Sequence, residues 1–345
     1  MEIYTSLCYN RPARRAGTGR TREGRGSMKT EQVEEIGKSL RENIGRVIVG
    51  REGTIRLMLA ALLADGHVLL EDMPGTGKTK LARSLAASLE GKFARIQFTP
   101  DLLPGDVTGM NVYNRKSGEF ELRKGPVFTN ILLADEINRA TPRTQSGLLE
   151  CMEERQVTID GESLPLGDPF FVIATQNPVE TAGTFPLPEA QLDRFMLKLS
   201  LGMPGREEEV AIMERFMKED PFGSLSPVAS LSLLGQAKEA VKQVFVHPEI
   251  EKYMVEIVAA TREDGRVVMG VSPRGTLAFL RAVKAYAALE GRGFCIPDDV
   301  KALAVPVLAH RMKLGYGQHS GQEAEEVVRE ILEQAKAPTE DFGLR

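Results

Sequence analysis

A glycine-rich stretch that ends in lysine and threonine, residues 71–79, has the residue types that bind a polyphosphate. It reads Glu-Asp-Met-Pro-Gly-Thr-Gly-Lys-Thr and lies between the apolar run 68–70 and a helical pattern. Gly75 and Gly77 lack a Cβ, so the backbone can turn tightly and direct N–H groups at an anion. The dipole of the following helix attracts the same anion. The order of strand, glycine loop and helix therefore predicts a phosphate-binding loop.

The side chains of this loop predict how the phosphates and a metal are held. We expect Lys78 to reach the β- and γ-phosphates and the Thr79 hydroxyl to ligate Mg²⁺. The usual pattern, G-x-x-x-x-G-K-[ST], has glycine where this chain has Asp72. Taken alone, the loop is also consistent with an ordinary strand-turn-helix junction. The residues predicted to contact the nucleotide here are Asp72, Met73, Pro74, Gly75, Thr76, Gly77, Lys78, Thr79 and Lys80.

Two carboxylates follow a second apolar run, residues 131–134, which is too short for most helices. Asp135 and Glu136 come directly after it, as residues at the end of a buried parallel strand face a ligand crevice. Asp135 can hold Mg²⁺ through its water shell, and Glu136 can orient the water that attacks the γ-phosphate. By themselves these acids are equally consistent with solvated charges. Together with a phosphate loop they predict a hydrolytic site.

An amide side chain follows a third apolar run, residues 170–175. This run leads into Gln176-Asn177-Pro178, which places Asn177 at the same predicted sheet edge. Asn177 can bind the γ-phosphate or the attacking water. Closing a turn before Pro178 is an equally good local explanation. We predict Asn177 as a third polar catalytic side chain.

Composition excludes several classes of protein. The chain has 345 residues, 42% of them hydrophobic, which suits a globular protein of two domains. Its apolar stretches fall short of the ~20 residues that cross a bilayer, and no segment near the start is of signal-peptide type. Cys8, Cys151 and Cys295 are isolated, which argues against zinc sites and disulfides. With a formal charge of −4 and no arginine- and aromatic-rich strand, we expect a cytoplasmic protein without a nucleic-acid partner.

The order of the patterns divides the chain into four parts. Residues 1–27 carry six arginines against two glutamates and predict a disordered basic extension, either an upstream start or a remnant of expression. A basic arm that touches a membrane or nucleic acid is the alternative. Residues 28–204 alternate strand-like runs with helical patterns and predict a parallel sheet flanked by helices, the nucleotide-binding α/β domain. Residues 205–335 predict a smaller all-helical domain, and 336–345 a flexible tail.

Two hairpins and two helix starts are predicted inside this framework. The first hairpin is predicted where residues 114–118 connect the apolar segments 112–113 and 120–122. The second is predicted within residues 156–162, where Asp160-Gly161 is a two-residue turn signal between alternating runs. A helix is expected to begin at Pro142 after Thr141, and another at Pro273 after Ser272.

Four blocks of the sequence resemble, in order, the signatures of MoxR-type AAA+ ATPases. The resemblance implies a P-loop NTPase fold followed by a helical lid. The two hairpins resemble the helix-2 and pre-sensor-1 insertions of the branch that also holds magnesium-chelatase motor subunits and replicative helicases. Asp72 in place of glycine is a variant that this family also shows. The blocks are 71–79, 134–140, 175–178 and 184–195, within a resemblance that covers residues 30–335.

The resemblance also implies roles that spacing alone does not provide. Arg194 matches the arginine finger, which reaches from one subunit into the nucleotide site of its neighbour; from the residues alone it is a surface cation at a helix end. Arg274 matches the sensor-2 arginine of the lid, and whether it acts in its own subunit or the next is open. Val49 and Gly50 resemble the segment that lies along the adenine.

The function implied is an ATP- and Mg²⁺-dependent ATPase that forms a ring, expected to be a hexamer, and hydrolyses ATP between subunits. Its expected work is chaperone-like remodelling, activation or maturation of a separate partner with a von Willebrand factor A domain. A nucleotide-gated binding scaffold with little turnover is one alternative. A chelatase-like or helicase-like motor subunit is another, although the sequence has no zinc module or evident DNA-binding domain.

Overall fold

The computed structural model describes residues 28–178, 183–218, 220–315 and 321–339. The predicted basic extension, residues 1–27, lies outside the described residues. So do residues 340–345 of the predicted tail.

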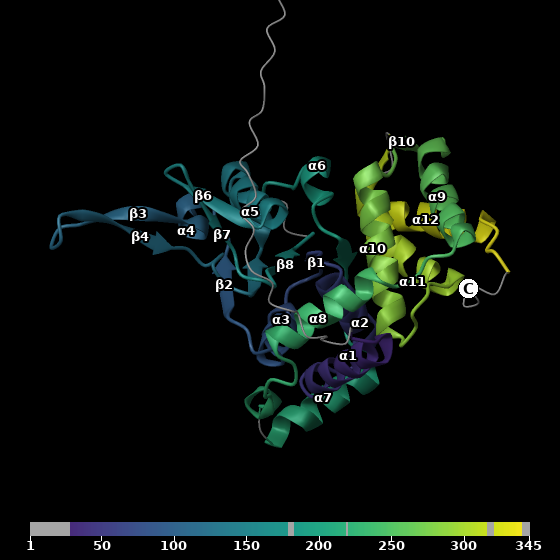
Figure 1. Ribbon diagram of the computed structural model, residues 1–345, viewed down its shortest axis with the longest axis horizontal. Helices are drawn as coiled ribbons and strands as arrows, with labels where there is room; N and C mark the ends of the chain where they lie inside the picture. The colour runs from purple at the N-terminus through teal and green to yellow at the C-terminus, as the bar shows by residue number, and fades with distance from the viewer. Residues whose placement is uncertain (1–27, 179–182, 219, 316–320, 340–345) are drawn as a thin grey trace, which may run out of the picture.

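A five-stranded parallel sheet forms the centre of the molecule, as predicted for residues 28–204 (Figure 1). Its strands are β1 (Val68–Glu71), β2 (Phe93–Gln97), β5 (Ile131–Asp135), β8 (Phe171–Gln176) and β9 (Leu197–Leu199), in the spatial order β2-β5-β8-β1-β9. Leu70 lies beside Thr175, and Gln97 beside Asp135. Because the carboxyl ends of parallel strands meet at one edge, the predicted phosphate loop and the two acids share that edge.

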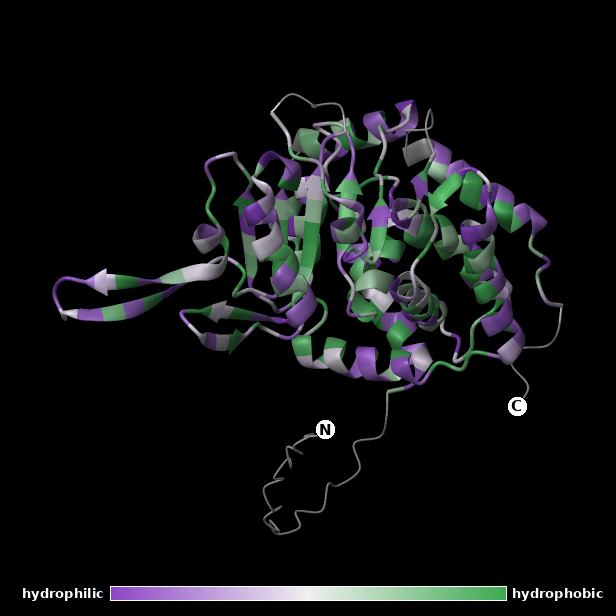
Figure 2. Ribbon diagram, turned by 90° about the horizontal axis from the view of Figure 1, so that it is seen from above, coloured by the Kyte–Doolittle hydropathy of each residue, from purple (hydrophilic) through white to green (hydrophobic). Residues whose placement is uncertain are grey.

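Helices cover both faces of the sheet. The main ones are α1 (Thr30–Gly45), α2 (Glu52–Leu63), α3 (Lys78–Ala87) and α5 (Pro142–Glu154), with short turns at α4 (Pro104–Thr108), η1 (Ile137–Arg139) and α6 (Glu189–Leu192). Side chains alternate between the faces of a strand, so Leu70 enters a core with α1, α2 and α3, whereas Leu69 enters a second core with α5. Hydrophobic residues accordingly concentrate in the central strands (Figure 2).

Both predicted hairpins are present. β3 (Gly109–Asn114) pairs with β4 (Glu119–Lys124), and β6 (Gln156–Ile159) pairs with β7 (Glu162–Pro165). The β3–β4 hairpin extends away from the sheet (Figures 1 and 2).

The part after residue 205 is mainly helical, as predicted, and also contains a small antiparallel ribbon. Strand β10 (Val267–Met269) pairs with β11 (Lys313–Leu314). Strands of three and two residues are too short to show an alternating pattern, which is why the sequence predicted helices alone. The helices are α7 (Arg206–Lys218), η2 (Pro221–Ser224), α8 (Leu231–Lys242), α9 (Pro248–Glu263), α10 (Pro273–Leu289), α11 (Pro297–Leu308), η3 (Ala309–Arg311) and α12 (Gly321–Gln334).

The two predicted helix starts are found at Pro142 and Pro273. Ser272 caps α10, because its hydroxyl oxygen accepts the Gly275 N–H at 3.2 Å. Thr141 precedes α5, but its hydroxyl lies 3.3 Å from that of Thr144 and makes no side-chain cap bond within the described residues.

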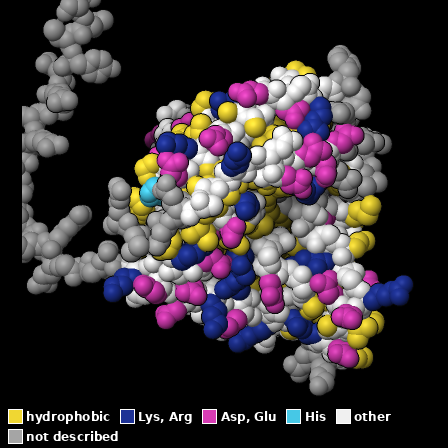
Figure 3. All heavy atoms as spheres, turned by 90° about the vertical axis from the view of Figure 1, so that its right-hand side faces the viewer, with side chains coloured by type: hydrophobic (Ala, Val, Ile, Leu, Met, Phe, Trp, Pro, Cys, Tyr) yellow, Lys and Arg dark blue, Asp and Glu magenta, His cyan; other side chains and the backbone are white. Residues whose placement is uncertain are grey.

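The helical part packs directly against the sheet domain. Helix α10 contacts α1 and α2, and α8 contacts the same pair, so one hydrophobic core runs through both parts. The outer face of the helical part carries basic and acidic side chains interspersed with one another (Figure 3). The shared hydrophobic core, rather than this outer face, holds the helices against the sheet.

Candidate functional site

The phosphate loop has the backbone that its glycines predicted. Gly75 and Gly77 have φ values of +85° and +93°, which lie in the left-handed region that favours glycine. Lys78 is the first residue of α3, and its Nζ donates to the carbonyl of Asp72 at 2.6 Å. Burial lowers the pKa of Lys78, while the nearby carboxylates of Asp72 and Asp135 act in the opposite direction. The ammonium is thus held at the mouth of the loop.

The residues predicted to hold Mg²⁺ face each other across the sheet edge. The Thr79 hydroxyl lies 3.5 Å from Asp135 Oδ2, and the Thr175 hydroxyl donates to Asp135 Oδ1 at 2.6 Å. These hard oxygen donors fit Mg²⁺, which takes few protein ligands and completes its shell with water and phosphate. The described residues contain no group of three or more His, Cys, Asp or Glu that could hold a metal. Arg95 Nη2 is 2.7 Å from the same Oδ2.

The carboxylate of Glu136 is held by two donors. Gln97 Nε2 donates to its Oε2 at 2.8 Å, and Arg139 Nε lies 2.9 Å from the same atom. Its backbone is in the left-handed region, with φ +55°, and its N–H donates to the Thr175 hydroxyl at 2.9 Å. A non-glycine residue fixed in this conformation is typical of functional sites. The arrangement orients the carboxylate at the same edge as the phosphate loop.

Sequence reasoning missed the two β2 residues that hold the acids. Arg95 contacts Asp135, and Gln97 contacts Glu136. They are polar residues two apart on one strand, a weak signal that they share a face. Their partners depend on β2 lying beside β5, which is a matter of sheet order.

Asn177 directly follows β8, whose last residue, Gln176, lies beside Glu71 at the start of the phosphate-loop stretch. Its strand pairs with β1 up to Glu71 and Gln176, and the Asn177 residue is 5% exposed. An amide at this buried edge can face a phosphate oxygen or a water.

Two of the predicted nucleotide contacts have other partners. The Asp72 carboxylate bonds to Ser200, Leu201 and Gly202 instead of pointing at the loop's hollow. Lys80 Nζ lies 3.7 Å from the ring centroid of Phe216, over helix α7. The other loop residues, Met73, Pro74 and Thr76, are exposed or half-buried.

The segment predicted to lie along adenine, Val49 and Gly50, packs against the start of α7. Gly50 has φ +69°, and a Cβ there would meet Glu208 Oε1 at 1.9 Å. Arg51 forms an ion pair with Glu208 at 2.9 Å, and its Nη2 reaches the carbonyl of Gly202 at 3.4 Å. The Val49–Gly50 segment therefore lies next to residues 200–202, the same residues that the Asp72 carboxylate binds.

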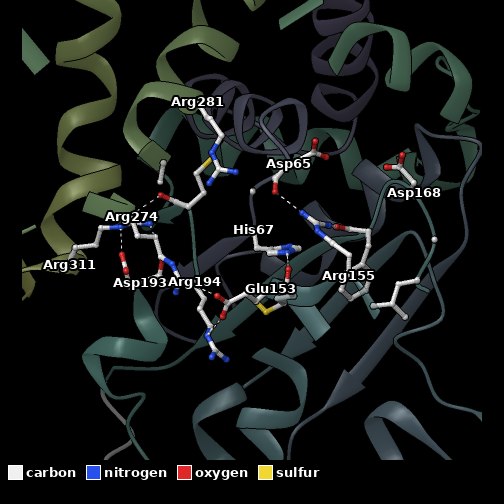
Figure 4. Close-up of a pocket in the computed structure, with 17 residues that line it drawn as sticks. Asp65, His67, Glu153, Arg155, Asp168, Asp193, Arg194, Arg274, Arg281 and Arg311 are labelled. Atoms are coloured by element: carbon white, nitrogen blue, oxygen red, sulfur yellow. Dashed lines mark hydrogen bonds and ion pairs between the residues drawn. The ribbon is translucent and has the colours of Figure 1, made fainter. Parts of the chain in front are cut away.

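The two arginines implied by the family resemblance lie together at the opposite edge of the sheet. Arg194 Nε is 3.0 Å from Glu153 Oε2, and Arg274 binds the other oxygen of that carboxylate (Figure 4). They line a cavity of about 470 Å³, together with residues that precede β1, β8 and β9, among them Asp65 and Asp168. Residues at the amino ends of these strands face away from the phosphate loop. The structure therefore does not bring Arg194 or Arg274 to the phosphate loop of its own chain.

The lid is anchored beside Arg194. Arg311 Nε donates to Asp193 Oδ1 at 2.8 Å, and the Ser272 hydroxyl lies 3.2 Å from Asp193 Oδ2. Arg311 is also bonded to the carbonyl of Phe195, at 2.7 Å. Burial lowers the pKa of Arg311 to about 10, against the opposing effect of the Asp193 charge. No local pattern in the sequence pointed to this contact.

The chain is similar to AAA ATPases. The model of the "ATPase family associated with various cellular activities (AAA)" matches residues 67–197, and that of the AAA lid domain matches residues 259–331. The parallel sheet with its glycine loop thus corresponds to the AAA domain of this family, and the helices after it include the AAA lid.

Relatives define the family more closely. The chaperone MoxR1 of Mycobacterium tuberculosis is 42% identical over 294 residues, 83% of this chain and 78% of that protein. Protein MoxR of Methylorubrum extorquens is 31% identical over 86% of this chain and 93% of its own length. The uncharacterized protein YeaC of Bacillus subtilis is 51% identical over 90% of this chain and 97% of its own length. The chain belongs to the MoxR family of AAA ATPases.

Solved structures agree on the architecture. A protein of Cytophaga hutchinsonii described as a candidate ATPase has a TM-score of 0.81 and 38% identity, over 90% of this chain and 97% of that one. A full-length MCM homologue from Methanopyrus kandleri, with a TM-score of 0.54 and 19% identity, shares the fold alone. In the described residues, none of the helices combines the length and apolar character needed to span a membrane.

Proposed function

We propose that this chain hydrolyses ATP in a Mg²⁺-dependent reaction at the interfaces of a ring, and uses the cycle to remodel or mature a partner protein. The observation that carries the proposal is the grouping of Lys78, Thr79, Asp135 and Glu136 at one sheet edge. The family membership of the chain supports the same reaction.

Each residue at this edge has a task that its geometry suits. The glycine loop and Lys78 bind the β- and γ-phosphates, and Thr79 and Asp135 hold the metal. When bound, Mg²⁺ neutralises charge on the phosphate oxygens. Glu136 orients the attacking water, since Gln97 and Arg139 fix its carboxylate. Asn177 contacts the γ-phosphate or that water.

The other half of the active site comes from a neighbouring copy. Arg194 and Arg274 lie at the amino edge of the sheet, so they serve a nucleotide bound to the next subunit. Two guanidinium groups that already share one carboxylate are arranged to bind a phosphoryl group, whose oxygens carry similar charge. We propose a closed ring, as a hexamer, because a head-to-tail contact of this kind forms a ring when its rotation closes.

The remaining proposals follow from the family. We propose that the chain consists of a nucleotide-binding domain, residues 28–204, and a lid, residues 205–335, and that it works in the cytoplasm. The name of the chaperone MoxR1 supports work on a partner, for which we propose a separate protein with a von Willebrand factor A domain. A scaffold without turnover would have no need for a fixed Glu136, and this contact favours the ATPase.

Phosphate release by wild type and by Glu136→Gln tests the hydrolysis. We expect the variant to bind ATP normally and to lose about a hundredfold or more in kcat, because it cannot orient the water. Glu154→Gln, on the exposed end of α5, makes the same change of charge and should match wild type. Equal rates for wild type and Glu136→Gln would remove the assigned role.

A further inference from the structure

The carboxylate of Asp72, the residue that replaces glycine in the usual phosphate-loop pattern, is fully engaged by one short segment. Its Oδ1 accepts the Ser200 hydroxyl at 2.6 Å and the Gly202 N–H at 2.9 Å. Its Oδ2 accepts the Leu201 N–H at 2.8 Å. Asp72 is 6% exposed, so these bonds form in a site largely closed to water. Charged hydrogen bonds of this kind are stronger than neutral ones.

The segment that Asp72 binds is the connection between the sheet and the lid. Strand β9 ends at Leu199 and helix α7 begins at Arg206, so residues 200–205 link the two parts. Gly202 has φ +68°, a backbone conformation that gives the segment its turn. Arg51 reaches the Gly202 carbonyl, which adds the Val49–Gly50 region to the same contact.

The backbone of Asp72 belongs to the phosphate site. Its carbonyl accepts the Lys78 ammonium at 2.6 Å, and its N–H donates to the carbonyl of Gln176, next to Asn177, at 3.4 Å. One residue therefore contacts the phosphate-binding lysine with its main chain and the interdomain link with its side chain. A change in the position of the loop backbone must move the link or break its three bonds.

We propose that Asp72 is a positioning residue that couples occupancy of the phosphate loop to the link 200–205 and through it to α7 and the lid. The inference rests on the proposed ATPase function. Glycine at this position would bind phosphate as well but would leave the N–H groups of Leu201 and Gly202 without this carboxylate. A ligand shifts the lid only if it favours one arrangement of the link over another, and Asp72 supplies that difference.

Asp72→Gly is the decisive variant, because it restores the residue of the usual pattern. We measure the affinity for a methylanthraniloyl derivative of ATP, kcat, and the ATP-induced change in amide exchange of α7, residues 206–218. The expected result is nucleotide affinity within about threefold of wild type, kcat about tenfold lower, and loss of the ATP-induced change in α7. Asp72→Asn, which keeps one acceptor oxygen, should fall between.

Two further variants separate coupling from simple loss of structure. Ser200→Ala removes one of the three hydrogen bonds to Asp72 by changing the link instead of the loop. It should change kcat and the amide exchange of α7 in the same direction as Asp72→Gly, but by a smaller factor. Glu207→Gln removes a carboxylate from the first turn of α7 and should behave as wild type.

The outcomes are distinct. Wild-type kcat and an intact α7 response in Asp72→Gly would overturn the coupling role and leave the ATPase proposal standing. A parallel fall of affinity, kcat and melting temperature in both Asp72→Gly and Ser200→Ala would also overturn it, by showing a structural role alone. Failure of the wild-type protein to bind the ATP analogue would remove the proposed function itself, and the coupling with it.

Discussion

Single side chains in this site owe their positions to polar neighbours, three of which lie on adjacent strands. Asp135 is held by Thr175 and Arg95, and Glu136 by Gln97 and Arg139. A catalytic carboxylate needs such support because small errors in its position lower the rate steeply. The contacts of Gln97 and Arg95 make β2 part of the candidate site, although it carries none of the predicted catalytic residues.

Gln97→Ala tests this support at the residue scale. Loss of the Gln97 hydrogen bond leaves Glu136 with Arg139 and a freer carboxylate, so we expect kcat to fall about tenfold with little change in KM. Steady-state phosphate release measures both constants. Gln156→Ala, on an exposed position of β6, is the matched control. A rise in KM with kcat unchanged would show instead that Gln97 contributes to nucleotide binding.

At the scale of elements, buried polar side chains connect strands and helices by directional hydrogen bonds, which apolar contacts do not provide. His67 precedes β1; its Nδ1 accepts the Val172 N–H at 3.0 Å, and its Nε2 lies 3.1 Å from the Met152 carbonyl. It thereby ties β1, β8 and α5 together behind the site. Burial, and next the charge of Arg155, lower the pKa of His67 to about 3.

This lowered pKa predicts a pH dependence of stability. Between the ordinary value of 6.5 and about 3, the unfolded chain binds a proton at His67 and the folded chain does not, so stability falls as pH falls. From pH 7 to pH 5 the loss is ~2 kcal/mol of unfolding free energy. Urea unfolding at pH 7 and pH 5 measures this loss. In His67→Gln the fall in unfolding free energy between the two pH values should be smaller than in wild type by that amount, since glutamine does not titrate. The same pH dependence in both proteins would contradict the assignment.

In the whole molecule, the phosphate loop and the two family-implied arginines lie on opposite edges of one sheet. The phosphate loop and acids lie at the carboxyl ends of the strands, and Arg194 and Arg274 lie beyond the amino ends. Asp193 and Arg311 attach the lid directly beside Arg194, so movement of the lid reaches that arginine. Under the proposed function, a single copy holds two incomplete sites, and assembly of copies completes them.

Mixing of two inactive variants tests the shared site. Arg194→Ala should bind ATP and lose turnover, because its own loop is intact but its neighbour's arginine is missing. Glu136→Gln keeps Arg194 and lacks the water-orienting acid. Mixed rings should recover part of the wild-type rate, since some intact loops then face an intact Arg194. No recovery after subunit exchange, or loss of ATP binding in Arg194→Ala, would show that Arg194 acts within its own subunit or only structurally.

The sequence by itself predicted the phosphate loop, the acids at the end of β5 and Asn177 as site residues, and it located both hairpins. These features depend on residue types a few positions apart, such as Gly75 and Gly77 before Lys78, and on the local order of strand, turn and helix. The family resemblance added Arg194 and Arg274, which local spacing described only as cations near helix ends.

Only the tertiary structure decided which distant groups meet. It directed the Asp72 carboxylate to residues 200–202 and joined Arg194 and Arg274 through Glu153. It also paired β10 with β11, whose strands are too short for any periodic signal. The physical reason is common to all three: each contact depends on sheet order and on how the lid packs, and neither is encoded in neighbouring residues.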